Sequence, residues 1–338
     1  MRIWLLTLLL LLFRMSNGQD PHFSQFYANP MYLNPAFTGT GECFRVGTQM
    51  RAQWVGLKHP FNTINFYADV NHGDLNSGFG LIFLRDQIGT PKLTSNELHG
   101  LYSYHLALNE KYHIRMGIQA SYVSKSIEYD DVFFEDQFTG LDISGNPSTD
   151  PITQFARKNL FDVSSGILFF KDNLYWVGIS GHHLNEPSTG FLYGSNLPLK
   201  FSVHGGIKLP LKGLNGLSLS KQHSFRLTPA FNYKSQGKYD QLDLGLYLIR
   251  DYIMLGMWYR GLFLKSDNDI RNSDVLSFQV GVKIEQLSIV YNYDITTSGL
   301  GQNNTLGSHE LSLQYRFCAS WPRKNYSHYR KLPCPDLK

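Results

Sequence analysis

The sequence has few charged residues, and no long apolar run after its first residues. Charged residues make up 17% of the 338 positions and aromatic residues 14%, which excludes a disordered chain, because disorder needs high charge and few aromatics. No run of about 20 apolar residues follows the first segment, so we expect no membrane-spanning helix in the mature protein. The net charge of +4 is small and scattered along the chain, which predicts no nucleic-acid partner.

Cysteine is also scarce. Cys43, Cys318 and Cys334 are the three cysteines, so at most one intramolecular disulfide can form and one thiol is left over. No C-x-x-C pair and no Cys/His spacing of a zinc site occurs. The sequence therefore predicts no metal and no cofactor.

The first residues read as a targeting signal. Met1 and Arg2 form a short basic start, and Ile3 to Phe13 are almost entirely apolar. This apolar stretch of about 11 residues is too short to span a bilayer. Small residues at Ser16 and Gly18 predict cleavage after Gly18. An uncleaved N-terminal anchor helix is the alternative, and either reading takes the protein out of the cytoplasm.

From about residue 45 onward, apolar and polar residues alternate with a period of two. Successive side chains of a strand point to opposite faces, so each segment has one apolar and one polar face. We predict 14 strands, most of them near the length that a tilted strand needs to cross a membrane. The predicted strands are 45–54, 61–70, 77–86, 95–108, 112–125, 161–170, 173–184, 200–209, 224–234, 239–249, 253–263, 274–284, 286–294 and 309–317.

The connections between these strands differ on the two sides. With the N-terminus taken as periplasmic, most turns on that side are short, as at 109–111 and 285–286. Most connections on the other side are longer, as at 126–160 and 185–199. Outer-membrane barrels show this asymmetry, with short periplasmic turns and longer extracellular loops. The fold we expect is all-β, a transmembrane antiparallel β-barrel of about 14 strands, and a soluble β-sandwich or propeller is the alternative.

Two further features follow from this fold. Tyr and Trp residues cluster toward strand ends, among them Tyr67, Tyr102, Tyr122, Trp176 and Tyr291, and are expected to form interfacial girdles. The polar faces carry charge, and closing the barrel must pair its first and last strands.

That closure brings particular residues together. It places Arg45 or Arg51 near Glu310 and Arg316, so that the charged lumen is either a salt-bridged filling or the lining of a pore. It also places Cys43 beside Cys318, which predicts a disulfide across the seam. Pairing of either cysteine with Cys334 is the alternative.

The segment before the first strand is rich in proline and aromatic residues. Pro21, Pro30 and Pro35 disfavour a regular helix, and the aromatic residues are too apolar for a free tail in water. The segment should pack in the barrel lumen, at its periplasmic mouth or against a partner. The residues proposed for this plug or partner-binding role are Asp20, Pro21, His22, Phe23, Ser24, Gln25, Phe26, Tyr27, Asn34, Pro35 and Phe37.

This stretch resembles the opening of the PorP/SprF family, outer-membrane proteins of Bacteroidetes tied to type IX secretion and gliding motility. The resemblance rests on Gln19 to Tyr27, on Asn34-Pro35-Ala36-Phe37-Thr38-Gly39 and on Arg51-Ala52-Gln53-Trp54. It implies an outer-membrane barrel that works with the secretion machinery and aids secretion or surface attachment of a partner such as an adhesin. The family brings no catalytic residues, so no enzyme is expected.

The chain thus divides into four parts. A signal peptide at 1–18 is followed by the proline- and aromatic-rich segment at 19–42, the barrel at 43–317 and a basic tail at 318–338. The expected partners are proteins of the type IX machinery, a secreted surface protein and membrane lipid. A passive porin or solute channel of the outer membrane is the alternative function, and a barrel enzyme with a site at its rim is a third hypothesis.

Overall fold

The protein is seen here in a computed structural model. It describes residues 20–41, 43–89, 92–129, 132–139, 142–143, 146–150, 153, 157–191, 195–211, 225–261, 275–297 and 305–317. The predicted signal peptide and the basic tail at 318–338 lie outside these residues.

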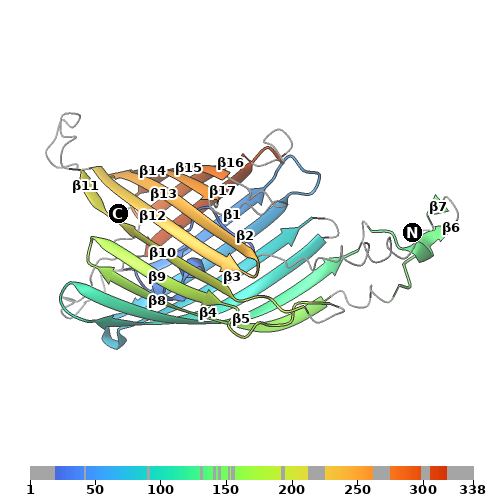
Figure 1. The fold of residues 1–338 in the computed structure, drawn as a ribbon, viewed down its shortest axis with the longest axis horizontal. Helices are drawn as coiled ribbons and strands as arrows, with labels where there is room; N and C mark the ends of the chain where they lie inside the picture. Colours follow the sequence, from blue (N-terminus) through green and yellow to red (C-terminus); the bar gives the residue numbers. More distant parts are fainter. Residues whose placement is uncertain are drawn as a thin grey trace, which may run out of the picture.

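Fourteen long antiparallel strands make up the barrel, and each corresponds to a predicted strand with ends that differ by a few residues. They are β1 (Phe44–Gln53), β2 (Phe61–His72), β3 (Ser77–Ile88), β4 (Lys92–Ala107), β5 (Tyr112–Glu128), β8 (Arg157–Lys171), β9 (Tyr175–His182), β10 (Lys200–Ile207), β12 (Phe225–Gln236), β13 (Tyr239–Arg250), β14 (Ile253–Gly261), β15 (Val275–Ile284), β16 (Leu287–Thr296) and β17 (Ser308–Phe317). In Figure 1 these strands cross the molecule side by side.

Short elements complete the fold. The lumen holds the helices α2 (Pro30–Leu33) and η1 (Pro35–Phe37), and η2 (Gly73–Leu75) forms the turn from β2 to β3. The three-residue strand β11 (Leu209–Leu211) continues β10 along β12. Between β5 and β8 lie η3 (Glu135–Gln137) and the small hairpin of β6 (Phe138–Thr139) and β7 (Asp142–Ile143), which Figure 1 shows well outside the barrel.

The sheet closes on itself at the seam between β1 and β17. Consecutive strands pair around the barrel, β10 pairs with β12, and β1 pairs with β17 over their whole lengths. In this register Arg51 lies opposite Glu310 and Arg45 opposite Arg316. The predicted neighbourhood of these charged residues across the seam is therefore confirmed.

The barrel has two mouths that differ in their connections. At the near mouth, where β1 begins and β17 ends, tight turns join β4 to β5 and β13 to β14. At the far mouth lie the longer connections from β5 to β8 and from β9 to β10. This two-sided pattern is the one that the sequence predicted and that outer-membrane barrels show.

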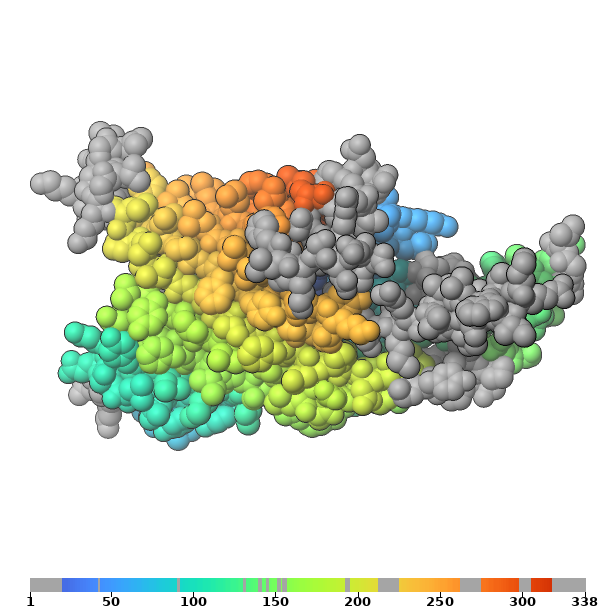
Figure 2. Space-filling view, in the orientation of Figure 1, coloured from blue at the N-terminus to red at the C-terminus, as the bar shows by residue number. Residues whose placement is uncertain are grey.

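The barrel is apolar outside and polar inside. On β2, for example, the side chain of Phe66 points outward with 46% of its surface exposed, and the neighbouring Asn65 is fully buried. In Figure 2 the side chains of this outer wall lie against one another from the green through the yellow to the orange part of the chain, where grey atoms do not cover them. A closed barrel with an apolar exterior satisfies every backbone group within the sheet, and it is a structure that can cross a membrane. None of the helices in the described residues is both long enough and apolar enough to pass through a bilayer.

One expectation about the aromatic residues was wrong in part. Tyr102, Tyr122 and Tyr291 lie on the outer surface, as interfacial girdles require. Tyr67 and Trp176 are buried in the lumen instead. Their strands place them on the inward-facing register, where they pack against the N-terminal segment rather than against lipid.

The seam also bears on the cysteine prediction. Cys43 is disulfide-bonded, and Cys318 and Cys334 both lie outside the described residues. Phe44 at the start of β1 pairs with Phe317 at the end of β17. Cys43 directly precedes Phe44 in the sequence, and Cys318 directly follows Phe317. We therefore expect peptide mapping of the unreduced protein by mass spectrometry to recover a Cys43–Cys318 linked peptide. A linked peptide joining Cys43 to Cys334 would show that the prediction is wrong.

Candidate functional site

The N-terminal segment, residues 20–39, lies inside the barrel. It begins at the far mouth with Asp20, which contacts Lys200 at the start of β10. It ends toward the near mouth with Gly39, whose backbone N–H donates to Asp69 at 2.8 Å. The first described residue therefore lies at the mouth opposite to the start of β1. Residues 20–39 therefore run through the lumen from the far mouth toward the near mouth before the barrel begins.

The prolines shape the path of this segment. Pro30 and Pro35 occupy the first turn of α2 and η1, where a missing N–H costs nothing and the fixed φ favours the helix. Asn34, between the two helices, caps η1 by accepting a hydrogen bond from the N–H of Ala36 at 2.8 Å. The hydroxyl of Tyr32 donates to the carbonyl of Pro21 at 2.8 Å, so the segment is folded back on itself.

A row of small residues on the lumen wall receives residues 33–38. The row runs through paired positions of six neighbouring strands: Gly78, Ser103, Gly117, Gly166, Ser180 and Ser202. A Cβ atom on Gly117 would collide with the backbone of Pro35 and Ala36, and one on Gly166 with the side chain of Asn34. Ser180 donates to the carbonyl of Leu33 at 2.9 Å. The glycines of this row thus leave a shallow depression in the lumen wall, and the Asn34-Pro35-Ala36 turn lies in it.

Charged side chains hold the end of the segment. Arg115 donates to the carbonyl of Thr38 at 2.6 Å and to that of Ala36 at 3.2 Å. Asp69, which accepts from the N–H of Gly39, is also paired with Arg45 through two hydrogen bonds at 2.7 and 2.8 Å. A buried carboxylate or guanidinium needs such partners, so the segment is part of the electrostatic balance of the lumen.

Ser24 and Gln25 lie at the centre of a second charged network, in the half of the lumen toward the far mouth. The backbone N–H of Ser24 donates to one oxygen of Glu310 at 2.7 Å, and that of Gln25 donates to the other oxygen at 3.0 Å. Arg51 lies 3.2 Å from Glu310 and 2.8 Å from Asp294. The hydroxyl of Ser24 donates to Asp294 at 2.6 Å.

This network joins the segment to both strands of the seam. Gln49 and Arg51 belong to β1 and Glu310 to β17, and Gln49 also donates to Glu310 at 2.7 Å. Arg260 of β14 donates to the hydroxyl of Ser24 at 3.0 Å and contacts the ring of His22 at 3.0 Å. Hydrogen bonds to ionised groups are roughly twice as strong as neutral ones, so Ser24 is fixed at the seam from several sides.

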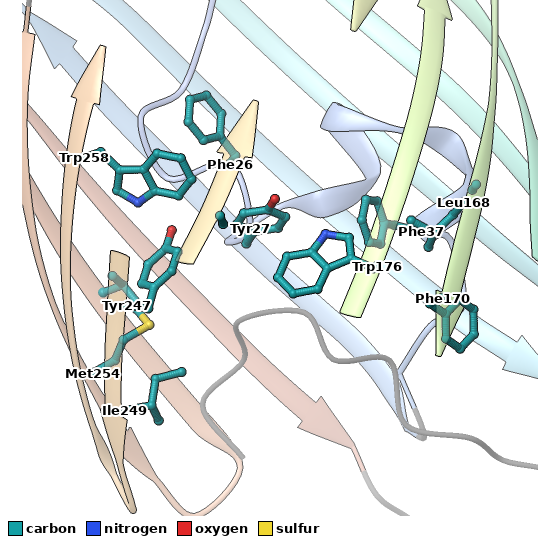
Figure 3. Close-up of a cluster of buried hydrophobic side chains, with 13 residues drawn as sticks. Phe26, Tyr27, Phe37, Leu168, Phe170, Trp176, Tyr247, Ile249, Met254 and Trp258 are labelled. Carbon is teal, nitrogen blue, oxygen red and sulfur yellow. The ribbon is translucent and has the colours of Figure 1, made fainter. Parts of the chain in front are cut away.

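Aromatic residues fill the lumen between these two polar regions. Phe26 packs edge-on against Trp258 with ring centroids 5.3 Å apart, and Tyr27 against Trp176 at 5.6 Å. Figure 3 shows the rings of Phe26 and Tyr27 beside Trp258, Tyr247 and Trp176, which come from β14, β13 and β9. Each such pair adds about 0.5–1.5 kcal/mol beyond the buried area. This cluster is the larger of two hydrophobic core clusters among the described residues, and the segment supplies part of it.

Asp20 is anchored at the far mouth by two cations. Its carboxylate lies 2.7 Å from the Nζ of Lys200 and 2.7 Å from the Nε2 of His183, whose Nδ1 is 3.1 Å from Asp162. Burial alone raises the pKa of Asp20, but Lys200 and His183 outweigh it and hold that pKa well below its usual range. Burial alone lowers the pKa of His183, but Asp20 and Asp162 outweigh it and raise that pKa to about 9.

The structure brings the predicted segment residues together within one lumen. Asp20, Pro21 and His22 are partly buried. The other predicted residues are buried, and they are Phe23, Ser24, Gln25, Phe26, Tyr27, Asn34, Pro35 and Phe37. Sequence reasoning missed the residues that receive them, above all the small-residue row, Trp176 and Trp258. Glycines on the polar faces of several strands were the available signal. Among the described residues no group of His, Cys, Asp and Glu is arranged to hold a metal ion.

The chain is similar to one protein family in sequence and to several outer-membrane barrels in fold. Residues 15–315 match the family described as type IX secretion system membrane protein PorP/SprF. No curated protein sequence matches the chain. Among solved structures, the CymD monoaromatic hydrocarbon channel is similar at 12% identity with a TM-score of 0.48, over 86% of this chain and 93% of that one.

Two further solved structures are similar over most of the chain. The Pseudomonas putida toluene transporter TodX has 9% identity and a TM-score of 0.46, covering 84% of this chain and 92% of its own. A Pseudomonas aeruginosa FadL homologue has 10% identity and a TM-score of 0.43, covering 90% and 96%.

The network at Ser24 predicts a large effect of replacing Glu310. Its two oxygens accept separate N–H groups of the segment, and the amide of Glu310→Gln would turn an NH₂ toward one of them. We expect the free energy of unfolding to fall by about 2 kcal/mol, the contribution of a hydrogen bond to a charged group. Urea titration of the protein folded in lipid vesicles measures this change.

Glu110→Gln is the matched control for this substitution. Glu110 is exposed in the turn between β4 and β5, where such a change stays within about 0.5 kcal/mol. Equal stabilities of the Glu310 and Glu110 variants would contradict the assigned role of Glu310.

The anchor of Asp20 predicts a dependence on pH. Because the pKa of His183 is raised from 6.5 to about 9, its contribution is complete below pH 6.5 and is lost as the pH rises through about 9. Because the pKa of Asp20 is lowered, its contribution is complete above pH 3.8 and is lost as the pH falls below that. Hydrogen exchange of the amides of residues 22–26, corrected for the intrinsic pH effect, should therefore be slower at pH 6.5 than above pH 9.

Two variants separate His183 from other histidines. His183→Gln should remove the difference between the two pH values. His72→Gln, at an exposed position at the end of β2, should keep it. Equal protection of residues 22–26 at both pH values in the unaltered protein would rule out the anchor as described.

Proposed function

Because the chain belongs to the PorP/SprF family of type IX secretion system membrane proteins, we propose that it is a plugged, non-enzymatic barrel that aids secretion or surface attachment of a partner protein such as an adhesin. The chain is an outer-membrane protein: it has the fold of outer-membrane barrels and belongs to a family of membrane proteins. Family membership also associates it with the type IX secretion system.

The filled lumen is the observation that carries the proposal. A barrel of 14 strands is wide enough to enclose a channel unless it is plugged. Here the N-terminal segment occupies the lumen with buried aromatic rings and with hydrogen bonds to charged wall residues at both of its ends. A passive porin, the alternative function, needs an open and hydrated path along its lumen. The packing of residues 20–39 favours a barrel that acts through protein partners.

Ser121, His99 and Glu97 form an arrangement in the lumen wall that resembles the serine, histidine and acid of a hydrolase. Ser121 lies 2.7 Å from the Nδ1 of His99, and Glu97 lies 3.4 Å from the Nε2 of the same ring. A nucleophile must reach its substrate, but Ser121 is buried to 1% exposure and does not line the cavity beside Glu97 and His99. Gln119 donates to its hydroxyl at 3.1 Å. This arrangement supports a hydrogen-bonded part of the lumen wall rather than a hydrolase site.

Planar-bilayer recordings test whether the lumen is closed. We expect the unaltered protein to show no large, steady conductance. Gly117→Val should open a pore, because its side chain would occupy the place of the Pro35 and Ala36 backbone and unseat the segment. Gly100→Val is the matched control, since Gly100 is exposed on β4 and a Cβ there meets only a backbone oxygen at 4.0 Å. A large, open conductance of the unaltered protein would instead favour the passive channel.

A second experiment tests the role in secretion. Deletion of residues 20–39 from the protein in its own bacterium should abolish surface display of the client adhesin while the barrel remains in the outer membrane. Abundance of the barrel, measured in outer-membrane fractions, controls for failed assembly. If display persists with the Gly117→Val variant and with the deletion, the segment has no part in secretion.

A further inference from the structure

A cavity of about 240 Å³ lies at the far mouth, between the N-terminal segment and strands β10, β12 and β13. Its walls include His22 and Tyr32 from the segment and Lys200, Lys234 and Tyr239 from the strands. A cavity of about 150 Å³ can bind a benzene molecule, so this cavity has room for one ligand with a single ring.

Buried amide groups in this cavity have unmet hydrogen-bonding capacity. Asn29, Gln49 and Asn232 line it, and each is at most 2% exposed. Both polar atoms of the Asn29 side chain, the Oε1 of Gln49 and the Oδ1 of Asn232 have no hydrogen-bond partner in the described part of the chain. Buried polar groups are nearly always hydrogen-bonded. These three amides therefore offer donors and acceptors to an occupant of the cavity.

One cation in the cavity makes no direct contact with an acid among the described residues. Lys234 lines the cavity and attracts the carboxylates of Asp243 and Asp20 from a distance, but no described residue forms a hydrogen bond or an ion pair with its ammonium group. The nearby acids have other partners: Asp20 is held by Lys200 and His183, and Asp243 lies 3.0 Å from Arg260. Asp240, at the start of β13, also has a partner of its own. A single positive charge is thus available for an anionic group.

Aromatic rings supply part of the remaining wall, which also includes Pro21, Leu33 and the carboxylates of Asp20 and Asp240. Phe23 and Tyr32 meet edge to face with centroids 5.6 Å apart, and Phe26 and Tyr239 belong to the same lining. A ligand that suits this cavity needs one face for packing on rings, several groups that both donate and accept hydrogen bonds, and one negative charge.

We propose that the cavity is a binding site for a sugar acid, a single pyranose ring that carries a carboxylate. Sugar hydroxyls both donate and accept, as the amides of Asn29, Gln49 and Asn232 require. The C–H face of the ring packs on Phe23 and Tyr32, and the carboxylate binds the ammonium of Lys234. Pockets with apolar walls and a few convergent polar groups are the usual form of small-molecule sites. The ligand is either a free sugar acid or the terminal residue of a polysaccharide.

Calorimetric titration of the full-length protein in detergent micelles tests the site. The probes are D-glucuronate, D-glucose as its neutral counterpart, and an oligosaccharide that ends in glucuronate. We expect glucuronate to bind at least about tenfold more tightly than glucose, the factor that one charge-assisted hydrogen bond contributes. Tighter binding of the oligosaccharide than of glucuronate identifies a polysaccharide end as the ligand, and weaker binding identifies the free sugar acid.

Variants locate the binding. Lys234→Met should abolish the preference for glucuronate over glucose, and Asn232→Leu should weaken the binding of both sugars. Lys238→Met is the control, because Lys238 is exposed in the turn between β12 and β13. Absence of binding by all three sugars, binding of glucuronate that Lys234→Met leaves unchanged, or equal affinities for glucose and glucuronate would each overturn the proposal. These measurements use the purified barrel, so their outcome is independent of its role in secretion.

Discussion

The interior of this barrel depends on how the carboxylate of Glu310 is satisfied. A buried carboxylate is tolerated only when it is paired and hydrogen-bonded. Glu310 meets this condition with Arg51 and Gln49 of β1 and with the backbone N–H groups of Ser24 and Gln25. The partners come from two parts of the chain, β1 and the N-terminal segment, so removing either of them leaves a buried charge less than fully compensated. The seam and the N-terminal segment therefore stabilise each other.

The N-terminal segment also supplies much of the hydrophobic core, which the strands of the barrel alone could not form. A transmembrane barrel turns its apolar residues toward lipid, and its polar lumen offers little surface for a hydrophobic core. Phe26, Tyr27 and Phe37 bring apolar rings into that lumen from outside the sheet. Trp176, Tyr247 and Trp258 face inward to meet them. The small-residue row keeps the wall flat enough for the segment to approach it.

Much of the barrel could be predicted from the sequence, and the lumen only in part. Strand positions follow from a period of two, which is a local property, and the seam follows from closure, so the neighbourhood of Arg51 and Glu310 was predictable. The side to which Tyr67 and Trp176 point was not, because an aromatic residue suits either a lipid interface or a packed interior. The depression that receives Asn34 was not predictable either. It depends on six small residues that only the register of the strands places in one row.

The path of the N-terminal segment has a consequence for the order of assembly. The hydrogen bond from Gln25 to Glu310 joins residues 285 positions apart, and the pair of Arg51 and Glu310 spans 259 positions. Both contacts close loops of nearly the whole chain, and neither is complete until β1 and β17 are neighbours. The contacts of Glu310 are therefore complete only when the N-terminal segment lies in the lumen and β1 and β17 have paired around it.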